Sequence, residues 1–281
     1  MSVRTVVAKD FLDVRRARTV RFVGGLYTTL IVLLFAQVRF GTGGPSDARM
    51  AVWNMVVVGA AFIPAIALVS AYLAIAGERE SGSIVSLLST PVSRRDVVLG
   101  KYVSRAVVVA ASLAVAFTIA AGLAAVWFPA FDPAVFAGTA ALTTLYALAY
   151  VSVAIAVSAS TATRARAMAG AIGFYFATNL VTLFDDVSGL AALEYVANEL
   201  LGLGLGADAI QFLGILSNPT RAYLASTMLV LPAELTEAIG LPARESLSWY
   251  VQPEIAVAIL FGWLVVPVAI GWYRFERADI T

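Results

Sequence analysis

Two neighbouring residues, Gly100 and Lys101, come closest in this sequence to a nucleotide site, because a Gly-Lys pair closes the phosphate-binding loop of many ATPases. That loop also needs a glycine five positions before the first residue of the pair and a Ser or Thr after the lysine. Arg95 and Tyr102 occupy these two places. We therefore expect no nucleotide and no other cofactor on this chain.

Acid–base and metal chemistry also have few candidate residues. The 281 residues include no Cys and no His, which excludes thiol nucleophiles, disulfides, the usual zinc sites and a Ser-His-Asp triad. One carboxylate pair, Asp185–Asp186, lies near a predicted membrane face. A membrane-embedded enzyme built on that pair is one hypothesis, but a solvated loop explains the pair better, and we predict no catalytic or metal-ligating residue.

Four milder polar residues lie inside apolar parts of the sequence. Thr143, Tyr146 and Tyr150 follow one another at helical spacing, so they share one helix face, and Asn179 lies in the next apolar run. Two interpretations are open. Such residues form hydrogen bonds between membrane helices, and they are also candidates for lining a transport pathway.

Composition indicates the environment in which these residues must be positioned. The chain is 60% hydrophobic and 13% charged, whereas soluble domains are about half apolar and about a quarter charged. A bilayer core about 30 Å thick needs roughly 20 apolar helical residues. We expect an all-α integral membrane protein, one domain over residues 1–281, with six transmembrane helices at the uncharged runs Phe22–Val38, Ala51–Ala76, Ala106–Phe128, Ala134–Ser158, Ala167–Phe184 and Ile255–Tyr273.

Positive charge near the span ends predicts the orientation, since Lys and Arg accumulate on the cytoplasmic side. If the N-terminus lies inside, most Lys and Arg residues fall in inner segments, and the outer segments hold only Arg39, Arg49, Arg221 and Arg244. Both termini are therefore predicted to be cytoplasmic, in a multi-pass protein of the plasma membrane.

The N-terminal segment, residues 1–21, carries Val3, Val7, Phe11 and Val14 at helical spacing among Arg and Lys residues. This pattern predicts an amphipathic helix lying in the inner headgroup layer. The alternative is a basic tail that only enforces the orientation.

A long acidic segment, residues 185–254, separates the fifth and sixth runs. Two of its stretches, LLGLGLGADAIQFLGIL and YLASTMLVLPAEL, are too apolar for a solvated loop. We expect short extracellular helices packed at the outer surface, or a re-entrant pair. An extra pair of spans would place Asp208 and Gln211 deep in lipid, which is energetically costly.

The stretch GERESGSIVSLLSTPVSRRDVVLGKYVSR, residues 77–105, is a strongly charged segment predicted to face the cytoplasm. SIVSLLST predicts a short helix with Ser81 or Ser83 as its N-cap, ended by Pro91. Ser93, followed three residues later by an acid, predicts the N-cap of a second helix that continues into the third run.

The short helix has an apolar side and a charged rim, which suits docking into a groove on a cytoplasmic partner. The alternative is a loop that lies against lipid headgroups. Because none of the six runs contains Asp, Glu, Lys or Arg, a proton-coupled carrier is disfavoured, and energy for transport is expected to arrive through the cytoplasmic loops. The candidate coupling residues are Glu78, Arg79, Glu80, Gly82, Ser83, Ile84, Leu87, Leu88, Pro91, Ser93, Arg94 and Arg95.

This loop resembles the signature of type 2 ABC export permeases, the nitrous-oxide-reductase-maturation-like branch included. In that family a Glu-x-Glu-x-Gly-(Thr/Ser) start is followed by Leu-Leu-Ser-x-Pro, then by Ser-Arg and Gly-Lys. Ser83 stands where the family more often has Thr. Outside the loop the resemblance is one of architecture. The matching positions are Glu78, Glu80, Gly82, Ser83, Leu87, Leu88, Ser89, Pro91, Ser93, Arg94, Gly100 and Lys101.

The resemblance implies a permease subunit of an ATP-driven exporter, whose coupling helix in residues 77–105 is seated in a cleft of a separate ATPase subunit that binds ATP and Mg²⁺. It also implies a dimer with a second permease chain, identical or different, surrounded by membrane lipid and without a nucleic-acid partner. It implies no substrate, because the family exports many kinds. The alternative function is a non-transporting membrane anchor or assembly factor in a maturation complex.

Overall fold

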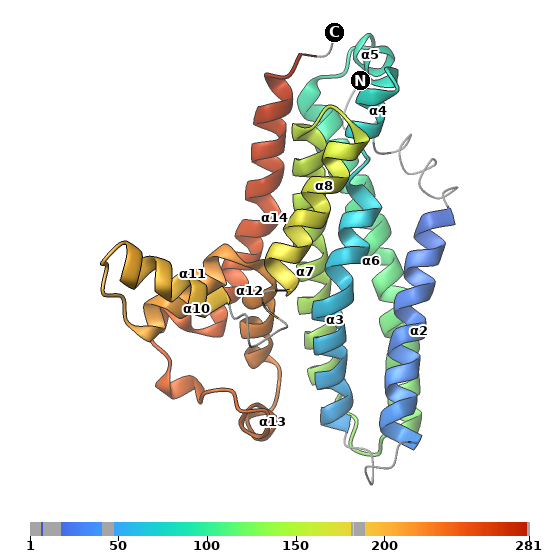
Figure 1. Cartoon of the computed structure of the whole chain (residues 1–281). Helices are drawn as coiled ribbons and strands as arrows, with labels where there is room; N and C mark the ends of the chain where they lie inside the picture. The colour runs from blue at the N-terminus through green and yellow to red at the C-terminus, as the bar shows by residue number, and fades with distance from the viewer. Residues whose placement is uncertain (1–6, 8–17, 41–47, 181, 183–188, 280–281) are drawn as a thin grey trace.

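The protein is a bundle of long helices with a group of short helices at its side (Figure 1). The computed structural model describes residues 7, 18–40, 48–180, 182 and 189–279, with all their side chains except those of 18–24, 48 and 180. Every regular element in this part of the chain is helical. The long helices are α2 (Arg18–Phe40), α3 (Ala48–Ala71), α6 (Arg94–Trp127), α7 (Pro133–Ser160) and α14 (Pro253–Glu276).

Four helical segments are long and apolar enough to cross a bilayer: Arg49–Glu80, Arg94–Trp127, Pro133–Ser160 and Pro253–Glu276. They contain the second, fourth and sixth predicted runs, and all of the third except its last residue, Phe128. The first run lies in α2, whose part Gly25–Phe40 is a shorter apolar helix. The fifth run begins in α8 (Arg164–Tyr175), which continues as the π-helix η1 (Phe176–Leu180). That the first and fifth runs cross the membrane stays a prediction.

The second predicted run is interrupted near its end. α3 stops at Ala71, and α4 (Ala76–Glu80) begins after a turn. The backbone N–H groups of Ile75 and Ala76 donate to Ser158 Oγ at 2.9 and 3.0 Å. These two donors are thereby diverted from the helical hydrogen-bond ladder to a side chain on α7, which fixes the break.

The central helix of the bundle is α7, which contacts α3, α6, α8 and α14. It approaches α14 closely at Gly271, where an added Cβ atom would lie 2.7 Å from the Cα atom of Ala156. A glycine allows two helix backbones to approach this closely, as small residues commonly do between membrane helices.

Aromatic pairs attach α2 to α6. The rings of Tyr27 and Phe117 meet edge to face with centroids 6.0 Å apart, and those of Phe35 and Phe128 with centroids 5.9 Å apart. Edge-to-face contacts of this kind are a favoured geometry for aromatic pairs. They fix the first long helix to the side of the bundle.

The segment before α14 is helical, as predicted. In Figure 1, α10 and α11 project sideways from the bundle, whereas α12 packs against α7 and α14. Its placement on the outer side of a membrane stays a prediction. Its elements are α10 (Gly189–Glu194), η3 (Tyr195–Leu200), α11 (Ala207–Ser217), α12 (Pro219–Ser226), η4 (Thr227–Leu229), α13 (Ala233–Ala238), η5 (Arg244–Ser246) and η6 (Trp249–Val251).

Two predictions fall largely outside the described residues. Of the predicted interfacial helix at residues 1–21, the structure describes only residue 7 and the backbone of 18–21, where α2 begins. The carboxylate pair Asp185–Asp186 lies wholly outside the described part of the chain.

Candidate functional site

The loop of residues 77–105 is folded against one end of the bundle, beside the C-terminal end of α14 (Figure 1). It consists of most of α4, then α5 (Ser83–Leu88) and the first turns of α6. α4 packs on α5 and also contacts α7 and α8. The loop is therefore anchored to several helices of the bundle.

The start of α5 depends on a glycine. Gly82 is the N-cap residue, with a φ angle of 74° and no side-chain hydrogen bond. This left-handed backbone conformation favours glycine, because it crowds a Cβ atom. The hydroxyls of Ser81 and Ser83 lie 3.0 Å apart and bond to each other. The prediction that Ser81 or Ser83 caps this helix is wrong.

The end of α5 and the start of α6 are confirmed. α5 ends at Leu88, ahead of Pro91. Ser93 Oγ accepts a hydrogen bond from the backbone N–H of Asp96 at 3.1 Å, and the Asp96 carboxylate accepts one from the Ser93 N–H at 3.2 Å. This reciprocal capping box starts α6 well before its apolar part.

Two carboxylates of α4 are bound within the chain. Glu78 Oε1 accepts a hydrogen bond from Lys101 Nζ at 2.6 Å, and Lys101 is 5% exposed. Glu80 Oε2 accepts one from the backbone N–H of Arg164 at 2.5 Å, where its negative charge is favourable because Arg164 begins α8. These contacts attach α4 to α6 and to α8.

Two of the three candidate arginines, Arg79 and Arg94, bind carbonyl groups within the chain, whereas Arg95 is exposed. Arg79 Nη1 donates to the carbonyl oxygen of Thr161, just past the end of α7, at 2.9 Å. Arg94 Nη1 donates to the carbonyl oxygen of Phe275, near the end of α14, also at 2.9 Å. The Arg95 guanidinium lies over an aromatic ring of α14. Arg79 and Arg94 therefore bind helix ends of this chain, and Arg95 contacts α14 through that ring.

The apolar side of α5 faces mostly inward. Ile84 is 1% exposed, and Leu87 and Leu88 are half-buried against the core. Val85 is 55% exposed and is the large apolar residue that α5 presents outward. The exposed residues at and after α5 are Ser83, Val85, Ser86, Ser89, Thr90 and Pro91. The outward face is therefore small, uncharged and rich in hydroxyl groups.

The four polar residues predicted within the apolar runs meet in one buried cluster. Thr143, Tyr146, Tyr150 and Asn179 are each at most 1% exposed. Asn179 Nδ2 donates to the Tyr150 hydroxyl at 3.0 Å, which links η1 to α7. Hydrogen bonding between helices, one of the two interpretations, is confirmed. That these residues line a pathway stays a prediction.

Helix α12 completes this cluster with residues that sequence analysis missed. The hydroxyl of Thr220 lies 2.9 Å from that of Tyr146 and 2.8 Å from that of Tyr150. The Tyr223 hydroxyl lies 2.8 Å from Thr143 Oγ1, and the Tyr223 ring stacks on that of Tyr146 with centroids 4.3 Å apart. The cluster thus joins α12 to α7.

A local signal for α12 was present in the sequence. Asn218 Oδ1 accepts a hydrogen bond from the backbone N–H of Thr220 at 2.9 Å, and Pro219 is the first helical residue. An Asn followed by Pro is typical of a helix start. The burial of this helix within the bundle has no such local signal, because it depends on partners in α7.

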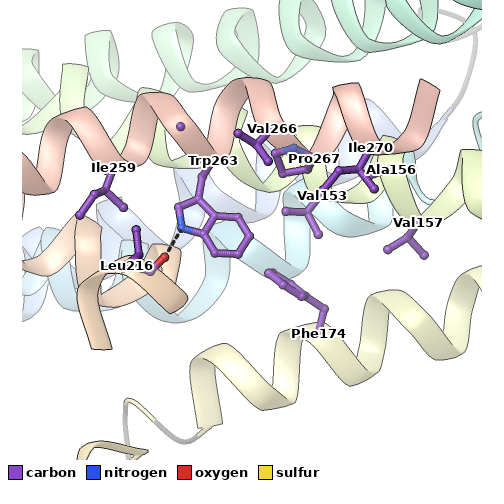
Figure 2. Close-up of a pocket in the computed structure, with 11 residues that line it drawn as sticks. Val153, Ala156, Val157, Phe174, Leu216, Ile259, Trp263, Val266, Pro267 and Ile270 are labelled. Carbon is purple, nitrogen blue, oxygen red and sulfur yellow. Dashed lines mark hydrogen bonds between the residues drawn. The ribbon is translucent and has the colours of Figure 1, made fainter. Parts of the chain in front are cut away.

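An apolar cavity of about 420 Å³, open to the surface of the chain, lies between α7, α8, α11 and α14 (Figure 2). Phe174 of α8 faces Trp263 of α14 with ring centroids 5.8 Å apart. The Trp263 indole N–H donates to the carbonyl oxygen of Leu216 in α11 at 3.2 Å. Because the lining residues carry no charge, this cavity suits an apolar ligand better than an ion.

Comparison with known proteins relates these features to a family. The model of the family described as "ABC-2 family transporter protein" matches residues 4–280. The chain belongs to the ABC-2 transporter family. This match covers the loop, the buried cluster and the cavity alike, and it confirms the family indicated by residues 77–105.

One relative of this ABC-2 chain is described as "Probable ABC transporter permease protein NosY" from Pseudomonas aeruginosa. The two are 29% identical over 119 residues, which is 42% of this chain and 43% of the relative. The match therefore spans less than half of the relative's length. Together with the family match, it supports a multi-pass membrane protein that serves as a permease component of a transporter.

Proposed function

We propose that this ABC-2 chain is the membrane-spanning subunit of an ATP-driven exporter in the plasma membrane. It is driven through residues 77–105 by a separate ATPase subunit, which binds ATP and Mg²⁺. Two permease chains, identical or different, and two ATPase subunits form the transporter. α2 and α8 with η1 supply the first and fifth spans, and both termini lie in the cytoplasm.

The exposed face of α5 carries this proposal. It presents Val85 beside the hydroxyls of Ser86 and Ser89, on a helix whose other side is packed against the core. Such a face can bind a partner without unfolding the loop, because the contacts that hold the loop lie on its inner side. The Glu78–Lys101 pair and the capping box at Ser93 restrain the loop. A displacement of α5 by the ATPase subunit therefore also displaces the long helices.

The docking face is tested by Val85→Asp. An exposed position tolerates the substitution in the folded chain, whereas a carboxylate buried in an apolar contact disfavours binding. The readout is the vanadate-sensitive ATPase activity that co-purifies with the tagged chain from its native membranes. We expect this activity to fall by roughly tenfold or more, the loss typical of a central interface residue.

Ala165→Asp is the matched control, because Ala165 is exposed at the start of α8, near the same end of the bundle but outside the loop. We expect it to retain the ATPase. Equal recovery of ATPase activity with the wild type and with Val85→Asp would exclude α5 as the docking element. Leu87 and Leu88 are less suitable probes, since their half-buried side chains also support the core.

A further inference from the structure

The C-terminal end of α14 is held by a side chain of the loop. The last carbonyl groups of an α-helix have no partner within the helix. Arg94 Nη1 lies 2.9 Å from the carbonyl oxygens of both Phe275 and Glu276, and 2.8 Å from that of Ala278. Since this nitrogen carries two hydrogens, at least one of them is shared between two carbonyls.

Charge and ring contacts reinforce this attachment. The C-terminal end of a helix carries a partial negative charge, which attracts a guanidinium. The Arg94 guanidinium lies 5.8 Å from the ring centroid of Phe275, a residue that is fully buried, and Arg95 lies 5.3 Å from that of Trp272. Two consecutive arginines at the start of α6 thus contact the last turns of α14.

Arg79 extends the attachment to a second helix. Its Nη1 donates to the carbonyl of Thr161, after α7, and its Nη2 donates to that of Asp279, after α14, at 3.3 Å. The loop between α3 and α6 therefore binds the ends of α7 and α14 at the same time, although Arg94 makes the closer contacts to α14.

We propose that Arg94 is a positioning residue that fixes the inner end of α14 to the loop, so that a displacement of the loop moves α14 together with α6. This inference rests on the proposed function, because the displacement is the one that the ATPase subunit imposes on α5. Pro267 lies in α14 between the attachment and the outer half of that helix, and it lines the apolar cavity. Movement of the inner end of α14 therefore reaches the wall of this cavity.

The attachment itself is tested without any partner. Hydrogen–deuterium exchange of the full chain in lipid nanodiscs reports how often the last turn of α14 opens. In Arg94→Gln we expect the amides of residues 273–279 to exchange faster by roughly tenfold, because charge-assisted hydrogen bonds to the helix end are lost. Arg94→Lys keeps the charge and is expected to fall between Arg94→Gln and the wild type.

Arg166→Gln is the matched control, since Arg166 is exposed on α8, and its exchange in residues 273–279 should equal that of the wild type. If Arg94→Gln does not fold, Arg94→Lys decides the outcome. Wild-type exchange in residues 273–279 of whichever variant folds overturns the inference.

The transmission of movement from the loop to α14 is tested in the complex with the ATPase subunit. The chain contains no Cys, so spin labels can be placed by Val57→Cys on α3, which packs mainly on α7, and Arg274→Cys on α14, at two exposed positions. MgATP with vanadate should shift the distance between the labels in the otherwise wild-type chain. Adding Arg94→Gln should abolish the shift while the ATPase subunit stays bound.

The outcomes separate the two ideas. An equal shift with and without Arg94→Gln overturns the inference and leaves docking at α5 intact. Failure of any ATPase subunit to bind the wild-type chain contradicts the proposed function and, with it, the transmission role of Arg94, whatever the exchange experiment shows about the attachment.

Discussion

Among single residues, Lys101 and Glu78 form the contact that joins α4 to α6. Lys101 is almost completely buried, and its ammonium lies 2.6 Å from Glu78 Oε1. Glu78 Oε2 is also buried, and it has no hydrogen-bond partner among the described residues. Removing charges from water is costly, and here each charge compensates for the other.

Lys101→Met is therefore expected to destabilise the protein, because it leaves the partly buried Glu78 carboxylate without its counter-charge. Since the Glu78 side chain is 26% exposed, the expected loss is about 1–3 kcal/mol of unfolding free energy, measurable as a lower thermal midpoint in detergent. The double variant Glu78→Gln with Lys101→Met should recover much of this loss. A double variant as unstable as Lys101→Met alone would show that the Lys101 side chain stabilises the protein through packing and not through its charge.

Among the elements, the pair α7 and α14 depends on close backbone contact at Gly271. A Cβ atom at this position would meet the Cα of Ala156 at 2.7 Å, and backbone cannot move aside as a flexible side chain can. The two helices can keep their present distance only if residue 271 has no side chain.

Gly271→Val should force the two helices apart and cost about 1–3 kcal/mol, as overpacking typically does. Gly262→Val is the control on the same helix, since a Cβ atom there meets nothing within 4 Å. Thermal unfolding of both purified variants is the measurement. Equal midpoints for the two would contradict a backbone contact between α7 and α14.

Local signals in the sequence were sufficient to predict the boundaries of several helices, but they did not predict which helices contact one another. Pro91 and the Ser93 capping box can be recognised from a few neighbouring residues. The end of α5 and the start of α6, which they predict, are both confirmed. The break after α3 depends on Ser158, far along the chain, and so had no local signal. For the same reason Arg94 was expected on a docking rim, whereas the structure places it on the end of α14.

The candidate site was likewise predictable in part. Thr143, Tyr146 and Tyr150 stand out as polar residues on one face of an apolar helix, and they do cluster. Thr220 was not identified, because nothing in its own segment indicates that α12 packs against α7. Residue type and spacing reveal which side chains need a partner, but the partner is set by tertiary packing.

For the whole molecule, the distribution of positive charge predicts which end of the bundle faces the cytoplasm. α5 and the C-terminal end of α14 lie at the same end (Figure 1). α13, at the other end, belongs to the segment expected outside.

Because the chain lacks Cys, single cysteines can test this orientation directly. Ala165 at the start of α8 and Ala238 in α13 are both exposed. With a membrane-impermeant maleimide on intact cells, Ala238→Cys should be labelled and Ala165→Cys should react only after the cells are opened. The reverse pattern would invert the proposed topology.

The apolar cavity has walls from four helices that are fixed in different ways. Val153 belongs to α7 and Phe174 to α8, Leu216 is tied to Trp263, and Val266 lies on α14 (Figure 2). The volume of the cavity therefore depends on the positions of these four helices relative to one another. A small shift of α14 against α7 would change the size of the largest apolar molecule that fits. The volume of this cavity therefore depends directly on the position of α14.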